Sequence, residues 1–268
     1  MTRFIHLTDL HISHPDAGDL GDKSGAVETL KRVVGILNAM EPQPEFVVAS
    51  GDLTNTGHPL SYELLHEILA PLKAPLVLAL GNHDKRAEFH ASIGNPVSTD
   101  PHCHDTLLGG LHVITLDTSI TGHVAGTICA AQFDFLEQAL NRHAETPKLI
   151  VMHHPPRIDP DGLPWGSIDM DSTDRLAEVL HGHNIAGILS GHIHINRVSN
   201  WNGIPLVVSN GQDSTVDLLE TKDLRLVEGT GLALCDWRSS GLTVSFVPLS
   251  PAPRELGLID RARLLAFT

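Results

Sequence analysis

Five short apolar segments stand out in the first 195 residues, and each is followed at once by aspartate, histidine or asparagine. Each segment is about as long as one buried β-strand, and apolar residues at helical spacing recur between several of them. Such alternation predicts an α/β fold with parallel strands and right-handed crossovers. Because parallel strands end at one edge of their sheet, we expect the polar residues to converge there. The predicted strands are residues 3–7, 46–49, 76–80, 149–152 and 185–189.

The remaining elements are predicted from apolar spacing and from glycine and proline. One further strand is expected at 112–116, and residues 85–111 read as a long surface loop or short helices. After residue 197, short apolar strands alternate with turn signals and are expected to be antiparallel and to close a second sheet. They cover residues 205–208, 231–235 and 242–247. Helices are predicted at about 24–40, 61–69 and 131–143, and from residue 172 or 173.

The length of 268 residues is enough for one full core. We expect one domain over residues 1–250, with residues 251–268 as a C-terminal tail. No apolar run resembles a signal segment or a membrane span, and the three cysteines form no Cys-x-x-Cys pair. These features predict a cytoplasmic protein with no membrane partner.

The formal net charge is −14, from 32 acidic and 18 basic residues. This balance disfavours a protein that binds a nucleic-acid polymer through its phosphates, and it leaves small substrates open. Histidine is unusually frequent, with 18 residues, as many as lysine and arginine together. That frequency invites a search for groups of metal ligands.

The residues after the five strands include many potential metal ligands. Carboxylate, imidazole and amide oxygen without thiolate suit Mn, Fe, Zn or Co. The pairs Asp9 with His11 and His192 with His194 are two residues apart, so an extended backbone would aim each pair at one locus. Seven ligands are too many for one tetrahedral ion and suit two ions that share a carboxylate. The candidates are Asp9, His11, Asp52, Asn82, His153, His192 and His194, with His83 beside them.

Taken together, these motifs resemble the calcineurin-like metallophosphoesterase superfamily, whose signature is D-x-H, G-D, G-N-H-D or G-N-H-E, a single H, and G-H-x-H. The chain carries all of them in order over residues 4–194. The resemblance implies that Asp52 bridges two divalent or trivalent transition metal ions. It places Asp9, His11 and His194 on one ion, and Asn82, His153 and His192 on the other. It also implies that His83 is catalytic, by stabilising phosphate charge or protonating the leaving oxygen.

Further residues narrow the resemblance to one branch. The protein Ser/Thr phosphatases carry G-D-x-x-D-R-G, whereas residues 51–57 here read Gly-Asp-Leu-Thr-Asn-Thr-Gly. This stretch, with His-His-Pro-Pro at 153–156, is similar to the bacterial class III cyclic nucleotide and glycerophosphodiester phosphodiesterases. That group implies a four-layer α/β/β/α sandwich of two mixed sheets flanked by helices. It also leaves open a homo-oligomer, with the C-terminal tail as a cap or oligomer contact.

The resulting hypothesis is a phosphodiesterase with two metals, acting on cyclic nucleotides such as 3',5'-cAMP or on glycerophosphodiesters. A metal-bridging hydroxide would attack phosphorus. The alternatives are a phosphomonoesterase or a nuclease, a non-catalytic scaffold of the same superfamily, and another chemistry at a two-metal site such as amide hydrolysis.

Several nearby residues have two interpretations. Asp84 could orient His83 or one of the metal ligands, or be a simple turn carboxylate. His154, His14, His58 and Arg157 could face the substrate or serve only the fold. Two histidine groups are interpreted as structural: residues 102–104, His-Cys-His, as a solvated loop, and His181 with His183, which lie two apart at a helix end and so on different faces.

Overall fold

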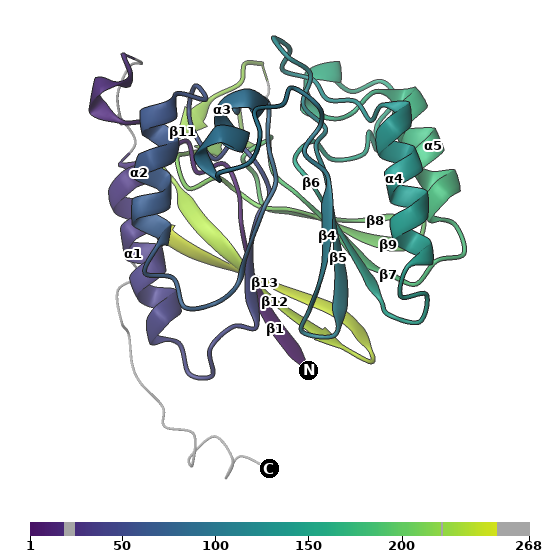
Figure 1. Ribbon diagram of the computed structural model, residues 1–268. Helices are drawn as coiled ribbons and strands as arrows, with labels where there is room; N and C mark the ends of the chain where they lie inside the picture. The colour runs from purple at the N-terminus through teal and green to yellow at the C-terminus, as the bar shows by residue number, and fades with distance from the viewer. Residues whose placement is uncertain (19–24, 221, 251–268) are drawn as a thin grey trace.

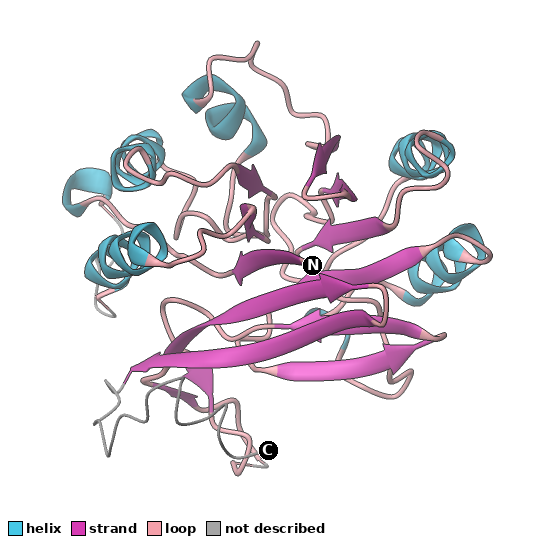
Figure 2. Ribbon diagram, turned by 90° about the horizontal axis from the view of Figure 1, so that it is seen from below, coloured by secondary structure: helices cyan, strands magenta, loops and turns pink. Residues whose placement is uncertain are grey.

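The structure is a computed structural model that describes residues 1–18, 25–220 and 222–250. Two β-sheets lie face to face in the centre, and helices cover the outer face of each sheet (Figures 1 and 2). The layers run helix, sheet, sheet, helix, which confirms the predicted four-layer sandwich. The predicted tail at residues 251–268 lies outside the described residues.

The first sheet consists of β1 (Thr2–Leu7), β2 (Phe46–Ala49), β3 (Leu76–Leu78), β12 (Thr230–Arg238) and β13 (Gly241–Ser250). Their spatial order is β13, β12, β1, β2, β3. β1, β2 and β3 are parallel, as their alternation with helices predicts. β12 pairs with β1 in the antiparallel sense, and β13 pairs in the same sense with β12.

The second sheet consists of β4 (His104–Leu108), β5 (Leu111–Leu116), β6 (Lys148–Met152), β7 (Ile185–Ser190), β8 (Arg197–Trp201) and β9 (Ile204–Val208). Their spatial order is β4, β5, β6, β7, β9, β8. The four central strands are parallel, and the two edge strands are antiparallel to their neighbours. A separate two-stranded ribbon joins β10 (Thr215–Val216) and β11 (Leu226–Val227).

The helices cover the sheets with their apolar faces. Helix α1 buries Leu30, Val33, Val34 and Leu37, one stripe at helical spacing. It packs with its neighbours on the first sheet, and a second cluster joins the other helices to the second sheet. The helices are α1 (Ala26–Ala39), α2 (Pro59–Leu69), α3 (Arg86–Ser92), α4 (Ala130–Asn141) and α5 (Met170–Leu180), with short 3₁₀ turns η1 (Pro15–Ala17) and η2 (Pro164–Gly166).

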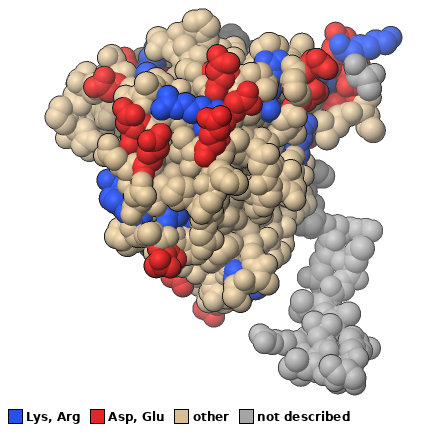
Figure 3. Space-filling view, turned by 90° about the vertical axis from the view of Figure 1, so that its right-hand side faces the viewer, with Lys and Arg blue, Asp and Glu red and all other residues tan. Residues whose placement is uncertain are grey.

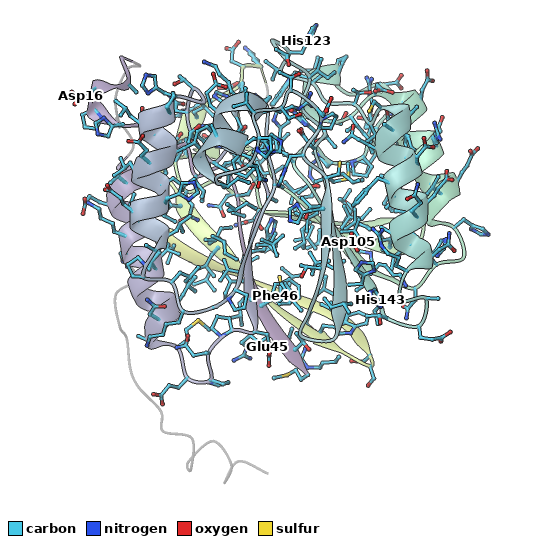
Figure 4. All side chains as sticks on the ribbon, in the orientation of Figure 1. Asp16, Glu45, Phe46, Asp105, His123 and His143 are labelled. Atoms are coloured by element: carbon cyan, nitrogen blue, oxygen red, sulfur yellow. The ribbon has the colours of Figure 1, made fainter. Side chains whose placement is uncertain are left out.

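A third apolar cluster fills the space between the sheets. The rings of Phe4 and Phe46 stack there with centroids 4.7 Å apart, and Figure 4 shows Phe46 near one end of this space. Val113 and Val151 contribute to the cluster from the second sheet. Strands buried on both faces explain why the sequence shows continuous apolar runs.

Two expectations about the strands are met only in part. Of the strands after residue 197, β8 and β9 do extend the second sheet, although β9 is parallel to β7, whereas β12 and β13 complete the first sheet. Apolar composition marks a strand but does not identify its partner. The region 85–111 also contains β4, which pairs with β5 although its side chains are only partly buried.

Among the residues described, no helix is both long enough and apolar enough to cross a lipid bilayer. On the side of the molecule shown in Figure 3, acidic and basic side chains are interspersed. Oligomeric state, the absence of nucleic-acid binding and the cellular location stay predictions.

Candidate metal centre

All eight predicted site residues meet at one edge of the sandwich, where the strands that precede them end. They follow strands of both sheets, whereas the sequence argument had placed them along one parallel sheet. Six of them line a pocket of about 260 Å³, and Asp9 and His153 lie fully buried beneath it. Those that follow the first sheet are Asp9, His11, Asp52, Asn82 and His83, and those that follow the second are His153, His192 and His194.

The two aspartates occupy the middle of this group. The Asp52 carboxylate lies 3.2 Å from His153 Nε2 and 3.7 Å from His11 Nε2. Asp9 Oδ1 lies 3.2 Å from His194 Nε2. Asp52 therefore lies between imidazoles from both sheets, where a bridging carboxylate would have to be. The ligand roles themselves stay a prediction.

Three of the imidazoles are oriented by hydrogen bonds on their outer nitrogens. His153 Nδ1 donates to the carbonyl of Ser50 at 3.0 Å, and His192 Nε2 donates to the carbonyl of Trp165 at 2.6 Å. His194 Nδ1 lies 3.2 Å from the carbonyl of Ser214. A carbonyl can only accept, so each bond leaves the other ring nitrogen unprotonated in the neutral histidine and able to bind a metal.

The backbone of the centre is unusual. Among the described residues, seven non-glycine residues have positive φ, and five of them are predicted ligands. The argument from extended i and i+2 pairs is therefore wrong in its geometry, because tight left-handed turns aim these side chains inward. Such conformations are costly and concentrate at functional sites. The five are Asp9 (51°), His11 (45°), Asp52 (49°), His192 (72°) and His194 (49°).

Two motif glycines allow the ligand turns to approach one another. A Cβ on Gly81 would collide with the Asp52 carboxylate, and a Cβ on Gly191 would collide with the Thr8 hydroxyl and the Asp9 carboxylate. Any larger residue would have to displace a predicted ligand. This explains in physical terms why glycine precedes Asn82 and His192.

The electrostatics of the centre favour bound cations. Burial raises the pKa of both aspartates, yet the adjacent imidazoles hold the pKa of Asp9 and of Asp52 below the usual range. Burial lowers the pKa of His153 and His194, but the neighbouring carboxylates raise the pKa of each to about 9. Two buried carboxylates thus stay ionised and attract positive charge, which metal ions supply when they displace the protons.

The donor set also fits a metal. Within the part of the chain that the structure describes, Asn82 Oδ1 is buried without a hydrogen-bond partner, beside the group formed by Asp52 and His153. A buried polar atom without a partner costs folding free energy unless an ion or a water molecule binds it. The carboxylate, imidazole and amide groups match the N and O ligands expected for Mn, Fe, Zn or Co. The residues present therefore fit the expected pair of ions.

His83 lies at the exposed side of the pocket. Its Nδ1 donates to the carbonyl of Asn55 at 2.7 Å, and its ring meets that of His11 edge-on with centroids 4.7 Å apart. The backbone N–H of His83 donates to Asp52 Oδ1 at 2.9 Å. The ring is thus fixed beside the predicted ligands, and Nε2 is left to meet a ligand in the pocket.

The sequence left the role of Asp84 open, and the contacts of its carboxylate now define it. Its carboxylate accepts backbone N–H groups of Leu53, Thr54 and Gly81 at 3.0 to 3.1 Å and the Tyr62 hydroxyl at 3.0 Å. It therefore ties the turn that carries Asp52 to the turn that carries Asn82. Burial raises the pKa of Asp84 to about 6, with Asp52 adding to the effect.

The other ambiguous residues serve the fold. His14 and His58 each accept a backbone N–H at the start of a helix, η1 and α2 respectively. Both ring nitrogens of His154 are occupied, by the Thr118 hydroxyl at 2.8 Å and the Val124 carbonyl at 2.9 Å. Arg157 hydrogen-bonds carbonyls of its own loop, at Asp159 and Gly162.

The segment 102–104 is not a solvated loop. His102 packs against Phe89 and His104, and His104 begins β4. Cys103 Sγ lies 3.5 Å from Gln132 Nε2 and packs against the core of the second sheet. His181 and His183 follow α5 and line a separate hollow, whose lining includes none of the predicted site residues.

Besides Ser50 and Asn55, whose carbonyls orient His153 and His83, two further residues beside the centre were missed. Trp165 orients His192 through its carbonyl and lines the pocket, and Ser214 orients His194. Their backbone carbonyls carry part of the role, so no residue-type pattern could have revealed them. A tryptophan in a loop of glycine, proline and aspartate was the one available signal.

Comparisons with known proteins agree with this geometry. A family model described as calcineurin-like phosphoesterase matches residues 2–196. The chain is 34% identical over 220 residues to a probable cyclic nucleotide phosphodiesterase of Rhodococcus erythropolis, covering 80% of this chain and 72% of that protein. It is 29% identical over 203 residues to a glycerophosphodiester phosphodiesterase of Enterobacter lignolyticus, covering 70% and 69%.

The fold is also found in solved structures. A dimetal phosphatase from Danio rerio aligns over 93% of this chain and 99% of its own, with a TM-score of 0.65. The two sequences are 13% identical, so this likeness shows the fold alone.

Proposed function

This chain belongs to the calcineurin-like phosphoesterase family, and from that premise we propose that it is a dinuclear-metal phosphodiesterase for small phosphodiesters. Cyclic nucleotides and glycerophosphodiesters are the proposed substrates, in keeping with the names of its relatives. The protein is a metal-dependent hydrolase of phosphodiesters, and the proposal concerns its site and its substrates.

One observation carries the proposal. Asp52 lies between His11 of the first sheet and His153 of the second, at 3.7 and 3.2 Å, with the unpartnered Asn82 Oδ1 in the same group. Asp9, His11, His194 and Asp52 would hold one ion, and Asp52, Asn82, His153 and His192 the other. When bound, such a pair polarises phosphoryl oxygens and lowers the pKa of water.

The protein's own groups position the substrate and move a proton. His83 Nδ1 donates to Asn55, so the neutral ring presents Nε2 to the pocket as an acceptor. When doubly protonated, the same nitrogen donates, either to a phosphoryl oxygen or to the departing alcohol oxygen. The carbonyl of Asn55 keeps the ring in place for both roles.

The test is hydrolysis by metal-stripped protein resupplied with Mn²⁺, on bis(p-nitrophenyl) phosphate and on p-nitrophenyl phosphate. We expect metal-dependent hydrolysis that favours the diester, and a loss of about 10²–10⁴-fold in His83→Ala. His181→Ala, an exposed histidine at the end of α5, is the matched control and should keep full activity.

Each other result has a clear meaning. A preference for the monoester would make the protein a phosphatase. Two bound metals without hydrolysis of either compound would favour the scaffold alternative.

A further inference from the structure

An apolar groove continues directly from the pocket of the candidate metal centre. Trp165, Ile193, Val216 and Leu224 line both the pocket and this groove, which extends to Leu163 and Leu218. We use "the apolar groove" for the surface formed by these six residues. It belongs to a hollow of about 270 Å³ that Arg157, Asp159 and Arg197 also line.

The side chains of the groove are not covered by the described part of the chain. Leu163, Leu218 and Leu224 are 74%, 63% and 58% exposed, and Trp165 is partly exposed. Exposed leucines that cluster around one hollow are unusual on a monomeric surface and mark a place where an apolar group binds.

The groove is tied to the reaction centre through Trp165. The Trp165 ring meets the His192 ring with centroids 5.7 Å apart, while its carbonyl accepts from His192 Nε2. A ligand whose phosphate is held by the centre would therefore have one of its ester groups beside the indole. Aromatic rings pack well against such a surface.

Resting on the proposed function, we propose that the apolar groove binds a planar ring carried by an alcohol portion of the diester, such as an aryl ester group or the base of a nucleotide. The hollow of about 270 Å³ is slightly smaller than the range of about 300–1,000 Å³ for ligand pockets, which suits one ring system better than a pair of acyl chains. Trp165 is then a specificity-determining residue, and diesters with a ring are favoured over diesters without one.

The test compares two diesters on metal-loaded protein, bis(p-nitrophenyl) phosphate with rings and glycerophosphoethanolamine without. Trp165→Ala should lower kcat/KM for the ring-bearing diester about tenfold and for the other less than twofold, and Trp165→Phe should restore most of the loss. The carbonyl that orients His192 is retained in both variants. Leu107→Ala, 50% exposed on β4 and outside the groove, should change neither rate.

A binding readout separates this proposal from the proposed function. Phenylphosphonate, but not methylphosphonate, should quench tryptophan fluorescence of the metal-loaded protein, and Trp165→Phe should abolish the quench. If neither diester is hydrolysed, the proposed function fails while the quench still reports ring binding.

Three results would overturn the proposal. One is an equal fall in kcat/KM for both diesters in Trp165→Ala. Another is a quench that persists in Trp165→Phe. The third combines two observations on Trp165→Ala. If sedimentation velocity shows that the variant dissociates from an oligomer, and kcat/KM changes equally for both substrates, the groove binds a second copy of the chain.

Discussion

A second histidine cluster, formed by His90, His102 and His104, lies beside α3 and the start of β4 and contrasts with the candidate metal centre. Ring spacing is the same in both. Centroids are 5.1 and 4.9 Å apart in the second cluster, and His153 and His192 in the centre are 5.1 Å apart. Close packing of imidazoles therefore does not distinguish them.

The carboxylates do distinguish them. The centre holds Asp9 and Asp52 among its imidazoles, whereas the carboxylate beside the second cluster, Asp117, already pairs with Arg86 at 2.7 Å. Burial and the neighbouring His104 and His90 together lower the pKa of His102 to about 4, although Asp117 acts in the opposite direction. Burial lowers the pKa of His104 as well, so His102 and His104 stay neutral. The comparison teaches that two features identify a metal centre among histidine clusters. Its carboxylates are not paired with an arginine, and its ligands lie in left-handed turns.

The largest expected effect comes from removing the central carboxylate. Asp52→Asn should lower kcat/KM by about 10³-fold and reduce bound metal, because the charge between the two imidazole groups is lost. His102→Ala should leave metal content and kcat/KM unchanged. Metal analysis by mass spectrometry and steady-state kinetics measure both, and loss of metal in His102→Ala would erase the distinction between the clusters.

A second prediction concerns the close approach of the ligand turns. Gly81→Ala should destabilise the protein by about 1–3 kcal/mol, because the added methyl meets Asp52. Gly35→Ala, exposed within α1 and with nothing near its Cβ position, should stabilise by about 0.5–1 kcal/mol. Urea unfolding compares the two, and a Gly81→Ala protein as stable as wild type would show that the turns can separate freely.

The last prediction concerns pH dependence, and its effect vanishes near neutral pH. The pKa of His102 is about 4 in the fold and 6.5 as its ordinary value, so the unfolded chain binds more protons between these limits. Stability should therefore fall as the pH drops from about 6.5 toward 4. His102→Phe keeps a ring beside Phe89 but cannot titrate, and its Tm should decline less over this range. Parallel Tm profiles for the two proteins would refute the neutral state of His102.

The sequence predicted the positions of the site residues better than the reason for their convergence. Each of Asp9, Asp52 and His153 follows an apolar run in the sequence, and in the structure each follows the corresponding strand. The pairing of β12 with β1 joins residues more than 200 positions apart, and no local pattern specifies such a partner. The left-handed turns could not be predicted, because aspartate and histidine adopt positive φ angles only in a minority of cases.

The supporting residues were harder to predict for a related reason. Asp84 was visible in a motif, but its role depends on N–H groups about 30 residues earlier in the chain. Asn55, Trp165 and Ser214 each orient a histidine through a backbone carbonyl, which every residue type possesses. Such contacts are fixed by tertiary packing alone.

The place of β12 has a consequence for how the protein is made. β1, which leads to Asp9, has one edge on β2 and the other on β12, whose residues leave the ribosome nearly 200 positions after β2. During synthesis the growing chain already holds all eight site residues once His194 has emerged, yet β1 still exposes an unpaired edge. An unpaired edge invites association with other chains. A growing chain that ends just after His194 therefore contains every site residue but cannot yet complete the first sheet, because β12 has not been made.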